Sequence, residues 1–306
     1  MVYLLNYYHV DFYMAITFSR MKGSYRSYLN ILTLFLLAFL LCSCSTLGYF
    51  WYDRLDRSLA NYFLNYIEFS NEQSDSIRSL AKDFKEWNSV YELPRYKIFM
   101  EEVLKLDEQV SVIDIKNIFD LANSLFKSSY TFFIPQTAAL FETLSDAQVE
   151  ELAQVLKDRV LKMDNEWKST KKNYNDNTVR DYTRLMNMLG IKLGNTQTDD
   201  IRKISLNLED KTFESIRAYE KWNSELIVLL NARKGPRFSA RCQTHLKSLL
   251  LIMPREEEIY ATMIVKTFSS LNQTQIKKFK KKVNYLISLV NKIILATNKN
   301  QLHNPY

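Results

Sequence analysis

Glycine and proline are both scarce in this sequence of 306 residues, which contains five of each. Average glycine usage is about 7%, and β-sheets need many tight turns that rely on glycine and proline. No stretch of useful length alternates apolar and polar residues as a half-buried strand would. The shortage of turn residues therefore argues against a sheet protein and favours long helices with few corners.

Cysteine and histidine are also rare, with three of each. Cys242 and His245 lie three residues apart, but a zinc site needs three or four ligands at suitable spacings. The sequence has no Gly-x-Ser-x-Gly elbow, phosphate-binding loop or dinucleotide fingerprint. We therefore expect no enzyme activity and no catalytic, cofactor-binding or metal residues. A hydrolase that uses Cys242 and His245 remains a third alternative.

An apolar run at residues 31–41 follows two basic residues and ends in Leu41-Cys42-Ser43-Cys44. A basic segment, about 7–15 apolar residues and a small residue at the cut are typical of a secretory signal peptide. The run therefore predicts a lipobox, with cleavage between Ser43 and Cys44 and acyl chains on Cys44. No disulfide could then form within the mature chain, because Cys242 would be its only free cysteine.

Two other interpretations of the same run remain open. An uncleaved membrane helix needs about 20 predominantly apolar residues, and polar residues interrupt the segment 28–51. Modification of Cys42 instead of Cys44 would place the bulky Leu41 next to the cut. We therefore prefer Cys44.

These features divide the chain into four parts. We expect a lipoprotein signal peptide at 1–43, a lipidated anchor and aromatic tether at 44–52, a helical domain at 53–296 and a flexible tail at 297–306. Residues 1–20 contain no basic residue before Arg20, so they either form a long first segment or lie upstream of a true start at Met21.

The residue that follows the acylated Cys44 indicates the membrane to which the lipoprotein is delivered. Ser45 stands where an aspartate would resemble an inner-membrane retention signal, so similarity to lipoprotein sorting implies the outer membrane, facing the periplasm. Removal of residues 1–43 leaves a mild net charge of about +5, whereas nucleic-acid-binding domains usually carry a strong basic patch and a pI above about 9. We expect a membrane partner through the lipid, an envelope protein partner and no nucleic acid.

Two segments are candidates for further membrane contact. Trp and Tyr rings favour membrane interfaces, and the tether ends in an aromatic cluster. Five lysines between residues 277 and 282 lie opposite an apolar stripe, and a basic amphipathic helix can bind anionic headgroups, although a solvated face is the alternative. The residues that we expect at the membrane are Trp51, Tyr52, Lys278, Lys281 and Lys282.

Apolar residues recur at helical spacing through most of the mature chain. Clear stripes run from Leu144 to Trp167, from Phe213 to Leu229 and from Ile276 to Ile293. Pro94 and Pro135 are expected to mark helix starts or breaks. The pattern predicts an all-α fold, an elongated bundle of long antiparallel helices with few turns.

Four phrases in the sequence share one pattern, in which a bulky apolar residue precedes Ser, Gly or Asn and a Gln follows three positions later. The phrases are 69–73, 144–148, 193–197 and 271–275. This spacing is that of a capping box, so we predict helix N-termini near Ser70, Ser145, Gly194 and Asn272. Either capping chemistry alone explains the similarity, or a divergent helical repeat does.

Several of these features occur together in a known family. They are the lipobox, the aromatic segment 49–52, the cap at 69–73, Trp87 and the segment Glu92-Leu93-Pro94-Arg95-Tyr96. Over residues 44–233 the chain resembles a domain-of-unknown-function family of predicted helical lipoproteins from Gram-negative bacteria. That family commonly has a histidine where this chain has Asn88, and the resemblance implies no biochemical activity.

A weaker similarity connects the Leu-x-x-x-Gln phrases with Spy/CpxP-type periplasmic chaperones, which carry Leu-Thr-x-x-Gln. We expect a lipoprotein of unknown molecular role that acts by non-enzymatic binding or scaffolding. The alternative is a Spy/CpxP-like chaperone for unfolded envelope proteins.

Overall fold

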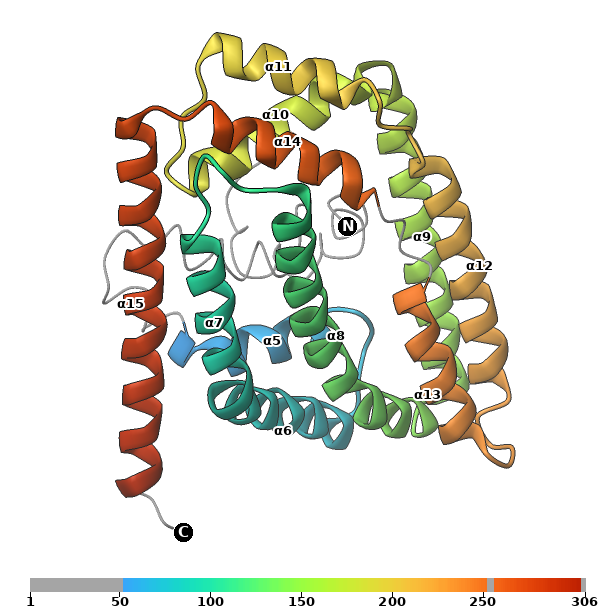
Figure 1. Cartoon of the computed structure of the whole chain (residues 1–306). Coiled ribbons are helices and arrows are strands. Elements are labelled where there is room, and N and C mark those ends of the chain that lie inside the picture. Colours follow the sequence, from blue (N-terminus) through green and yellow to red (C-terminus); the bar gives the residue numbers. More distant parts are fainter. Residues whose placement is uncertain (1–51, 252–255, 304–306) are drawn as a thin grey trace.

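The computed structural model of the chain describes residues 52–251 and 256–303 (Figure 1). All regular elements in these residues are helical, which confirms the all-α prediction. The α-helices are α5 (Leu55–Leu64), α6 (Asn71–Trp87), α7 (Leu93–Leu104), α8 (Val112–Glu142), α9 (Asp146–Thr170), α10 (Tyr174–Met188), α11 (Asn195–Ser205), α12 (Thr212–Asn231), α13 (Phe238–Ser248), α14 (Glu257–Ser269) and α15 (Gln273–His303). A π-helix, η1 (Asn88–Glu92), joins α6 to α7, and two 3-10 helices, η2 (Lys171–Asn173) and η3 (Leu249–Leu251), follow α9 and α13.

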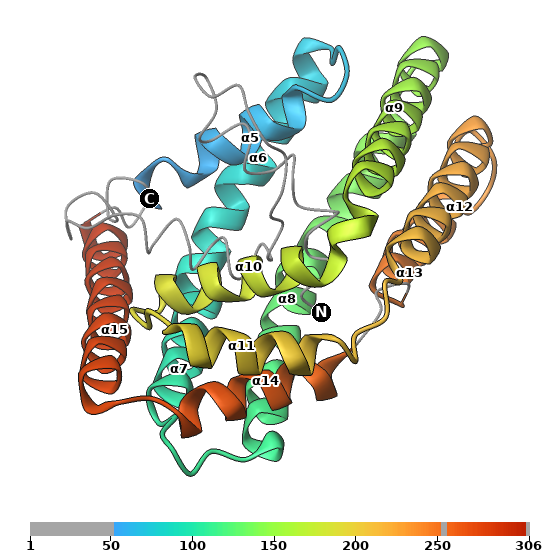
Figure 2. The ribbon, with the colours of Figure 1, turned by 90° about the horizontal axis from the view of Figure 1, so that it is seen from above.

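The helices do not share one axis direction, as they would in an elongated antiparallel bundle. Helices α7, α9, α12, α15 and the first part of α8 run roughly one way in Figure 1, whereas α6, α11 and α14 run across them. Figure 2 shows α15 beside α7 on one side of the molecule and the pair α9 and α12 on the other. Two of the crossing helices are short, since α11 has 11 residues and α14 has 13.

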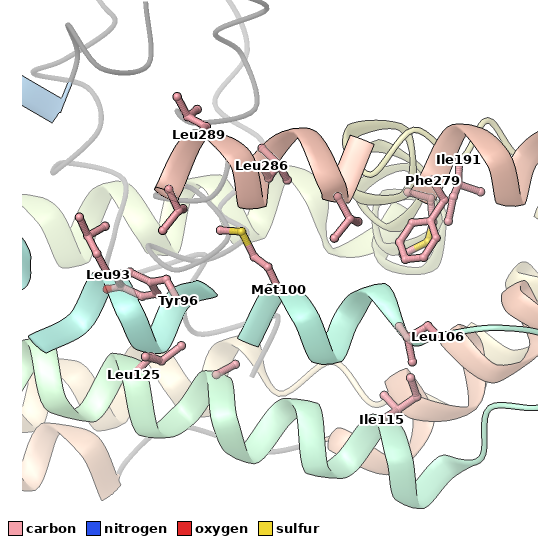
Figure 3. Packing of buried hydrophobic residues seen from close by; sticks show 14 of the residues in the cluster. Leu93, Tyr96, Met100, Leu106, Ile115, Leu125, Ile191, Phe279, Leu286 and Leu289 are labelled. Atoms are coloured by element: carbon pink, nitrogen blue, oxygen red, sulfur yellow. The ribbon is translucent and has the colours of Figure 1, made fainter. Parts of the chain in front are cut away.

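Two hydrophobic clusters form the core. The larger cluster joins α5, α6, α7, the first half of α8, α10, α11, α14 and α15. The smaller one joins the second half of α8 with α9, α12 and α13. Helix α8 therefore connects the two clusters, and burial of apolar area at about 25 cal/mol per Å² stabilises both. Figure 3 shows part of the larger cluster, where Met100 points from α7 toward α15.

The four predicted helix N-termini are confirmed, since α6, α9, α11 and α15 begin directly after Ser70, Ser145, Gly194 and Asn272. The hydroxyls of Ser70 and Ser145 and the side-chain oxygen of Asn272 accept hydrogen bonds from the backbone N–H of the glutamine three positions later. Gly194 has no side chain, so only the returning half of the box forms there, from the Gly194 N–H to the side chain of its glutamine.

Two boundaries differ from those expected. The tether was predicted to end at residue 52, but Tyr52 is only 3% exposed and belongs to the larger cluster. The helical domain was predicted to end at 296 and to be followed by a flexible tail, but α15 continues to His303. The predictions for Ser43, Cys44 and Trp51 lie outside the described residues.

Candidate functional site

Helix α15 carries seven lysines and no acidic residue. Its apolar stripe, which includes Phe279, Val283 and Leu286, is buried in the larger cluster. The opposite side of the helix is therefore directed away from the body. We call its exposed lysines the lysine face of α15: Lys277, Lys278, Lys280, Lys281 and Lys292.

The charge of the lysine face is not compensated within the body. Many other surface lysines have a carboxylate one turn away, as Lys97 has Glu101 and Lys168 has Asp164. No such partner exists for the five lysines of the face among residues 52–251 and 256–303. Positive charge without nearby acids attracts anionic ligands or surfaces.

Lys282 behaves differently from its neighbours. Its side chain is half-buried beside Gly190, where an added Cβ would lie 3.3 Å from the Lys282 Cβ. Burial lowers the pKa of Lys282, and its Nζ lies 5.7 Å from the centroid of the Tyr285 ring. The membrane contact predicted for Lys282 is corrected accordingly: Lys278 and Lys281 are exposed, whereas Lys282 packs into the body.

Tyr52 also differs from the prediction that its ring lies at a membrane interface. The Tyr52 hydroxyl is 3.2 Å from the carbonyl oxygen of Lys85 and 3.1 Å from the Oδ1 of Asn88, both of which can accept its hydrogen bond. Desolvation of the ring raises the pKa of Tyr52 well above its ordinary value. Tyr52 is therefore a core residue, because α6 covers it.

The hydroxyl of Tyr52 reaches a buried polar centre at the π-helix η1. Asn88, Ser89 and Glu92 are all less than 4% exposed. The Glu92 Oε1 accepts hydrogen bonds from Arg95 at 2.5 Å and from the Ser128 hydroxyl at 2.8 Å. Hydrogen-bonded pairing of this kind is what a buried carboxylate needs.

Other groups of the polar centre have fewer partners. Among the described residues, neither the Asn88 Nδ2 nor the Glu92 Oε2 has a hydrogen-bond partner. Burial raises the pKa of the neighbouring Tyr96 to about 12. Single π-turns within helices are frequent at functional sites, but Glu92 is only 1% exposed. We therefore assign this centre a structural role, in which it joins α6, α7 and α8.

The Cys242–His245 pair does not have the geometry of an activated nucleophile. Cys242 is completely buried, and desolvation raises the pKa of its thiol to about 11. The His245 ring stacks on Trp222 with centroids 4.8 Å apart, and its Nε2 lies 3.0 Å from the Trp222 carbonyl oxygen. A reactive cysteine needs a lowered pKa and solvent access, so the thiol is poorly suited to hydrolysis.

Residues 52–251 and 256–303 contain no group of three or more His, Cys, Asp or Glu side chains that could hold a metal ion. In the same part of the chain, no helix combines the length and the apolar character that crossing a bilayer requires.

Comparison with known proteins gives a match over more than half of the chain. A family of unknown function, DUF6279, matches residues 65–259. The chain belongs to the DUF6279 family. No curated protein and no solved structure matches it. The DUF6279 match begins at the end of α5 and ends in the first turn of α14. It thus includes the polar centre and the Cys242–His245 pair, whereas the lysine face of α15 lies beyond it.

Proposed function

We propose that this DUF6279 protein is an outer-membrane lipoprotein whose helical body faces the periplasm and acts by binding or scaffolding. The observation that carries the proposal is the short distance in sequence between the lipobox cysteine, Cys44, and Tyr52, the first core residue in the described part of the chain. A chain spans at most about 3.6 Å per residue, so eight residues hold the body within about 30 Å of the lipid. The body would then work at the membrane surface.

The described side chains support binding rather than catalysis. Cys242, the one cysteine among them, is buried and its thiol has a raised pKa. The nearby His245 ring is hydrogen-bonded to the carbonyl oxygen of Trp222. The buried carboxylate of Glu92 is held by Arg95. The groups that most resemble catalytic residues thus have structural partners.

The anchor is tested by the intact mass of the protein extracted from membranes, measured beside two single variants. Cys44→Ala should abolish the acylated mass of a chain that begins at residue 44, because it removes the acylated thiol. Cys42→Ala is the matched control and should keep that mass, since residue 42 leaves with the signal peptide. An unlipidated full-length mass in the unmodified protein would overturn the proposal, and loss of lipid only in Cys42→Ala would move the anchor to Cys42.

The binding role is tested by crosslinking in intact cells. A scaffold should crosslink to one or a few envelope proteins in stoichiometric amounts. A chaperone of the Spy/CpxP type should instead suppress the aggregation of unrelated unfolded proteins without ATP. Suppression of aggregation without a discrete crosslinked partner would favour the alternative.

A further inference from the structure

We propose that the lysine face of α15 docks on a bilayer surface that contains anionic phospholipids, with α15 lying along the plane of the membrane. The proposal rests on the proposed function only for the lipid anchor that holds the body near the bilayer. It adds a second attachment, made by protein side chains, and it fixes the orientation of the body.

The exposed side of α15 is long and straight enough for such a contact. Six exposed residues follow one another at helical spacings of three or four; they are Lys277, Lys281, Asn284, Ser288, Lys292 and Leu295. At 1.5 Å per residue this line is about 27 Å long. The opposite side of the helix is buried against the body (Figure 3), so α15 can meet a flat surface without losing its internal packing.

The chemistry of this line fits anionic headgroups. Its lysines have no acidic partners within residues 52–251 and 256–303, and α15 contributes no carboxylate that would repel phosphate. Leu295 extends the same line and is 62% exposed. A basic face that carries an exposed apolar residue is the pattern by which interfacial helices combine charge attraction with shallow insertion.

The start of the described chain lies next to this helix. The segment that leads into α5 lies beside α15 in both Figure 1 and Figure 2. Tyr52 is hydrogen-bonded to Asn88 of η1, and η1 in turn packs against α15. The tether from the lipid therefore joins the body near the C-terminal half of α15. With the anchor at that end, the lysines at 277–281 would form the contact farther along the same helix.

The test uses the full protein extracted from membranes and reconstituted into vesicles of phosphatidylcholine, with or without phosphatidylglycerol. Acylation of the lysine amines, followed by mass spectrometry, measures the reaction rate of each lysine. We expect Lys277, Lys281 and Lys292 to react about fivefold more slowly on the anionic vesicles, the factor that corresponds to about 1 kcal/mol per lysine near an anionic surface. Raising the salt to about 1 M should remove this protection, because the Debye length falls to about 3 Å.

Three exposed lysines elsewhere serve as internal controls. Lys157 on α9, Lys172 in η2 and Lys247 on α13 are exposed and have no acidic partner among the described residues. Their reaction rates should be equal on both kinds of vesicle. The proposal would be overturned if the lysine face also reacted at the same rate on vesicles with and without phosphatidylglycerol. It would also be overturned if the anionic vesicles slowed the three control lysines as much as the lysine face.

Two triple variants with the same change in net charge separate local recognition from total charge. Lys277→Gln/Lys278→Gln/Lys281→Gln should abolish the protection of Lys292, whereas Lys157→Gln/Lys172→Gln/Lys247→Gln should preserve it. The thermal unfolding midpoint shows whether each variant is folded, and exposed lysines should change it little. Persistent protection of Lys292 in the first variant would overturn the proposal.

Two further measurements separate the remaining outcomes. Protection that inorganic phosphate removes at constant ionic strength would indicate a phosphate site instead of a membrane contact. The intact mass reports on the anchor independently of lysine reactivity, so an acylated protein with an unprotected α15 would overturn the docking alone.

Discussion

The side-chain amides of Gln73 and Gln148 hydrogen-bond to each other in both directions, with N···O distances of 3.1 and 2.7 Å, although 75 residues separate them. Gln197 and Gln275 do the same with distances of 3.3 and 2.9 Å. In each case the glutamine oxygen also accepts a hydrogen bond from its own N-cap N–H at 2.9 Å. The N-termini of α6 and α9, and those of α11 and α15, are thus joined by the same network.

The agreement between the two pairs extends to the loops. Each glutamine amide also donates to the carbonyl oxygen two residues before the N-cap of the partner helix; these acceptors are Thr143, Glu68, Ser270 and Lys192. Capping chemistry by itself does not require two capping glutamines to meet. The repeated network therefore favours a divergent internal repeat over independent helix starts.

Replacement of Gln148 tests the first network. Gln148→Met removes both the returning bond of the capping box and the bonds to Gln73 and Glu68, so we expect a loss of about 2 kcal/mol in the free energy of unfolding. Urea unfolding followed by circular dichroism measures it. Gln154→Met is the control, because Gln154 is exposed on α9 and its side chain donates to the exposed Asp158. A change of about 0.5 kcal/mol or less is expected there.

A double-mutant cycle isolates the contact between the two glutamines. Gln73→Met/Gln148→Met should be less destabilised than the two single variants together, with a coupling energy of about 1 kcal/mol, because residues in direct contact are not additive. Strict additivity would show that the amides act only as separate caps. The cycle of Gln197 and Gln275 should give the same sign.

The helix N-termini could be predicted from the sequence because a capping box is complete within four residues. The pairing of the boxes could not, because it depends on how α6 and α9 pack after 75 residues of intervening chain. Pro135 shows the same limit. It was expected to start or break a helix, yet it lies inside α8, where burial of Ile134 and Ala138 in the smaller cluster holds the helix together on both sides.

The two corrected membrane contacts have a related cause. Periodicity predicts the side of the helix on which Lys282 lies, and the interface preference of aromatic rings led to the prediction for Tyr52. Neither shows which neighbouring element covers the side chain. Helix α6 covers Tyr52, and the chain at Gly190 reaches Lys282. Lys278 and Lys281 remain exposed because, in the part of the chain that the structure describes, no helix packs on the outer side of α15.

Arg233 connects the end of α12 to the corner between α8 and α9, and it is only 3% exposed. Its guanidinium donates to the carbonyl oxygens of Leu144 at 2.6 Å and Leu230 at 3.0 Å and also reaches Asp146. Arg233→Met removes the guanidinium donor of the Leu144 carbonyl and one of two donors to the Leu230 carbonyl, which keeps the Arg233 backbone N–H at 3.1 Å. We therefore expect a loss of about 3 kcal/mol in the free energy of unfolding. Arg233→Lys should recover little of it, because an ammonium lacks the planar fork.

The control for this prediction is Asp146→Asn, since the Asp146 side chain is 97% exposed. An exposed ion pair contributes about 0–1 kcal/mol. A loss in Asp146→Asn as large as that in Arg233→Met would contradict the view that the carbonyl contacts dominate. Urea unfolding of the three variants decides between these outcomes.

The ion pair of the polar centre should respond differently to removal of its two partners. Arg95→Met leaves the buried Glu92 carboxylate with the Ser128 hydroxyl as its remaining donor, so we expect a loss of about 2 kcal/mol, less than for a fully buried pair because Arg95 is 38% exposed. Glu92→Gln keeps an acceptor for Arg95 and removes the buried charge, so its loss should be smaller. The reverse order in thermal unfolding would show that Glu92 is not held by Arg95.

Alkaline pH should unfold the protein through its buried phenols and thiol. Burial raises the pKa of Tyr96 to about 12 and that of Cys242 to about 11, and it also raises the pKa values of Tyr130 and Tyr182. The Tyr130 and Tyr182 hydroxyls donate to the carbonyl oxygens of Leu246 and Met263, and a phenolate could not do so.

The sign of the pH effect follows from proton linkage. Between the unfolded and folded pKa values the folded state binds more protons, so the free energy of unfolding falls as pH rises, starting near pH 9 for Cys242 and near pH 10 for the tyrosines. We expect the tyrosinate absorbance to rise together with the loss of helical circular dichroism. Tyr96→Phe should weaken the pH dependence between about pH 10 and 12, because it removes one of the linked protons. Full tyrosine ionisation below the unfolding transition would contradict the burial of these rings.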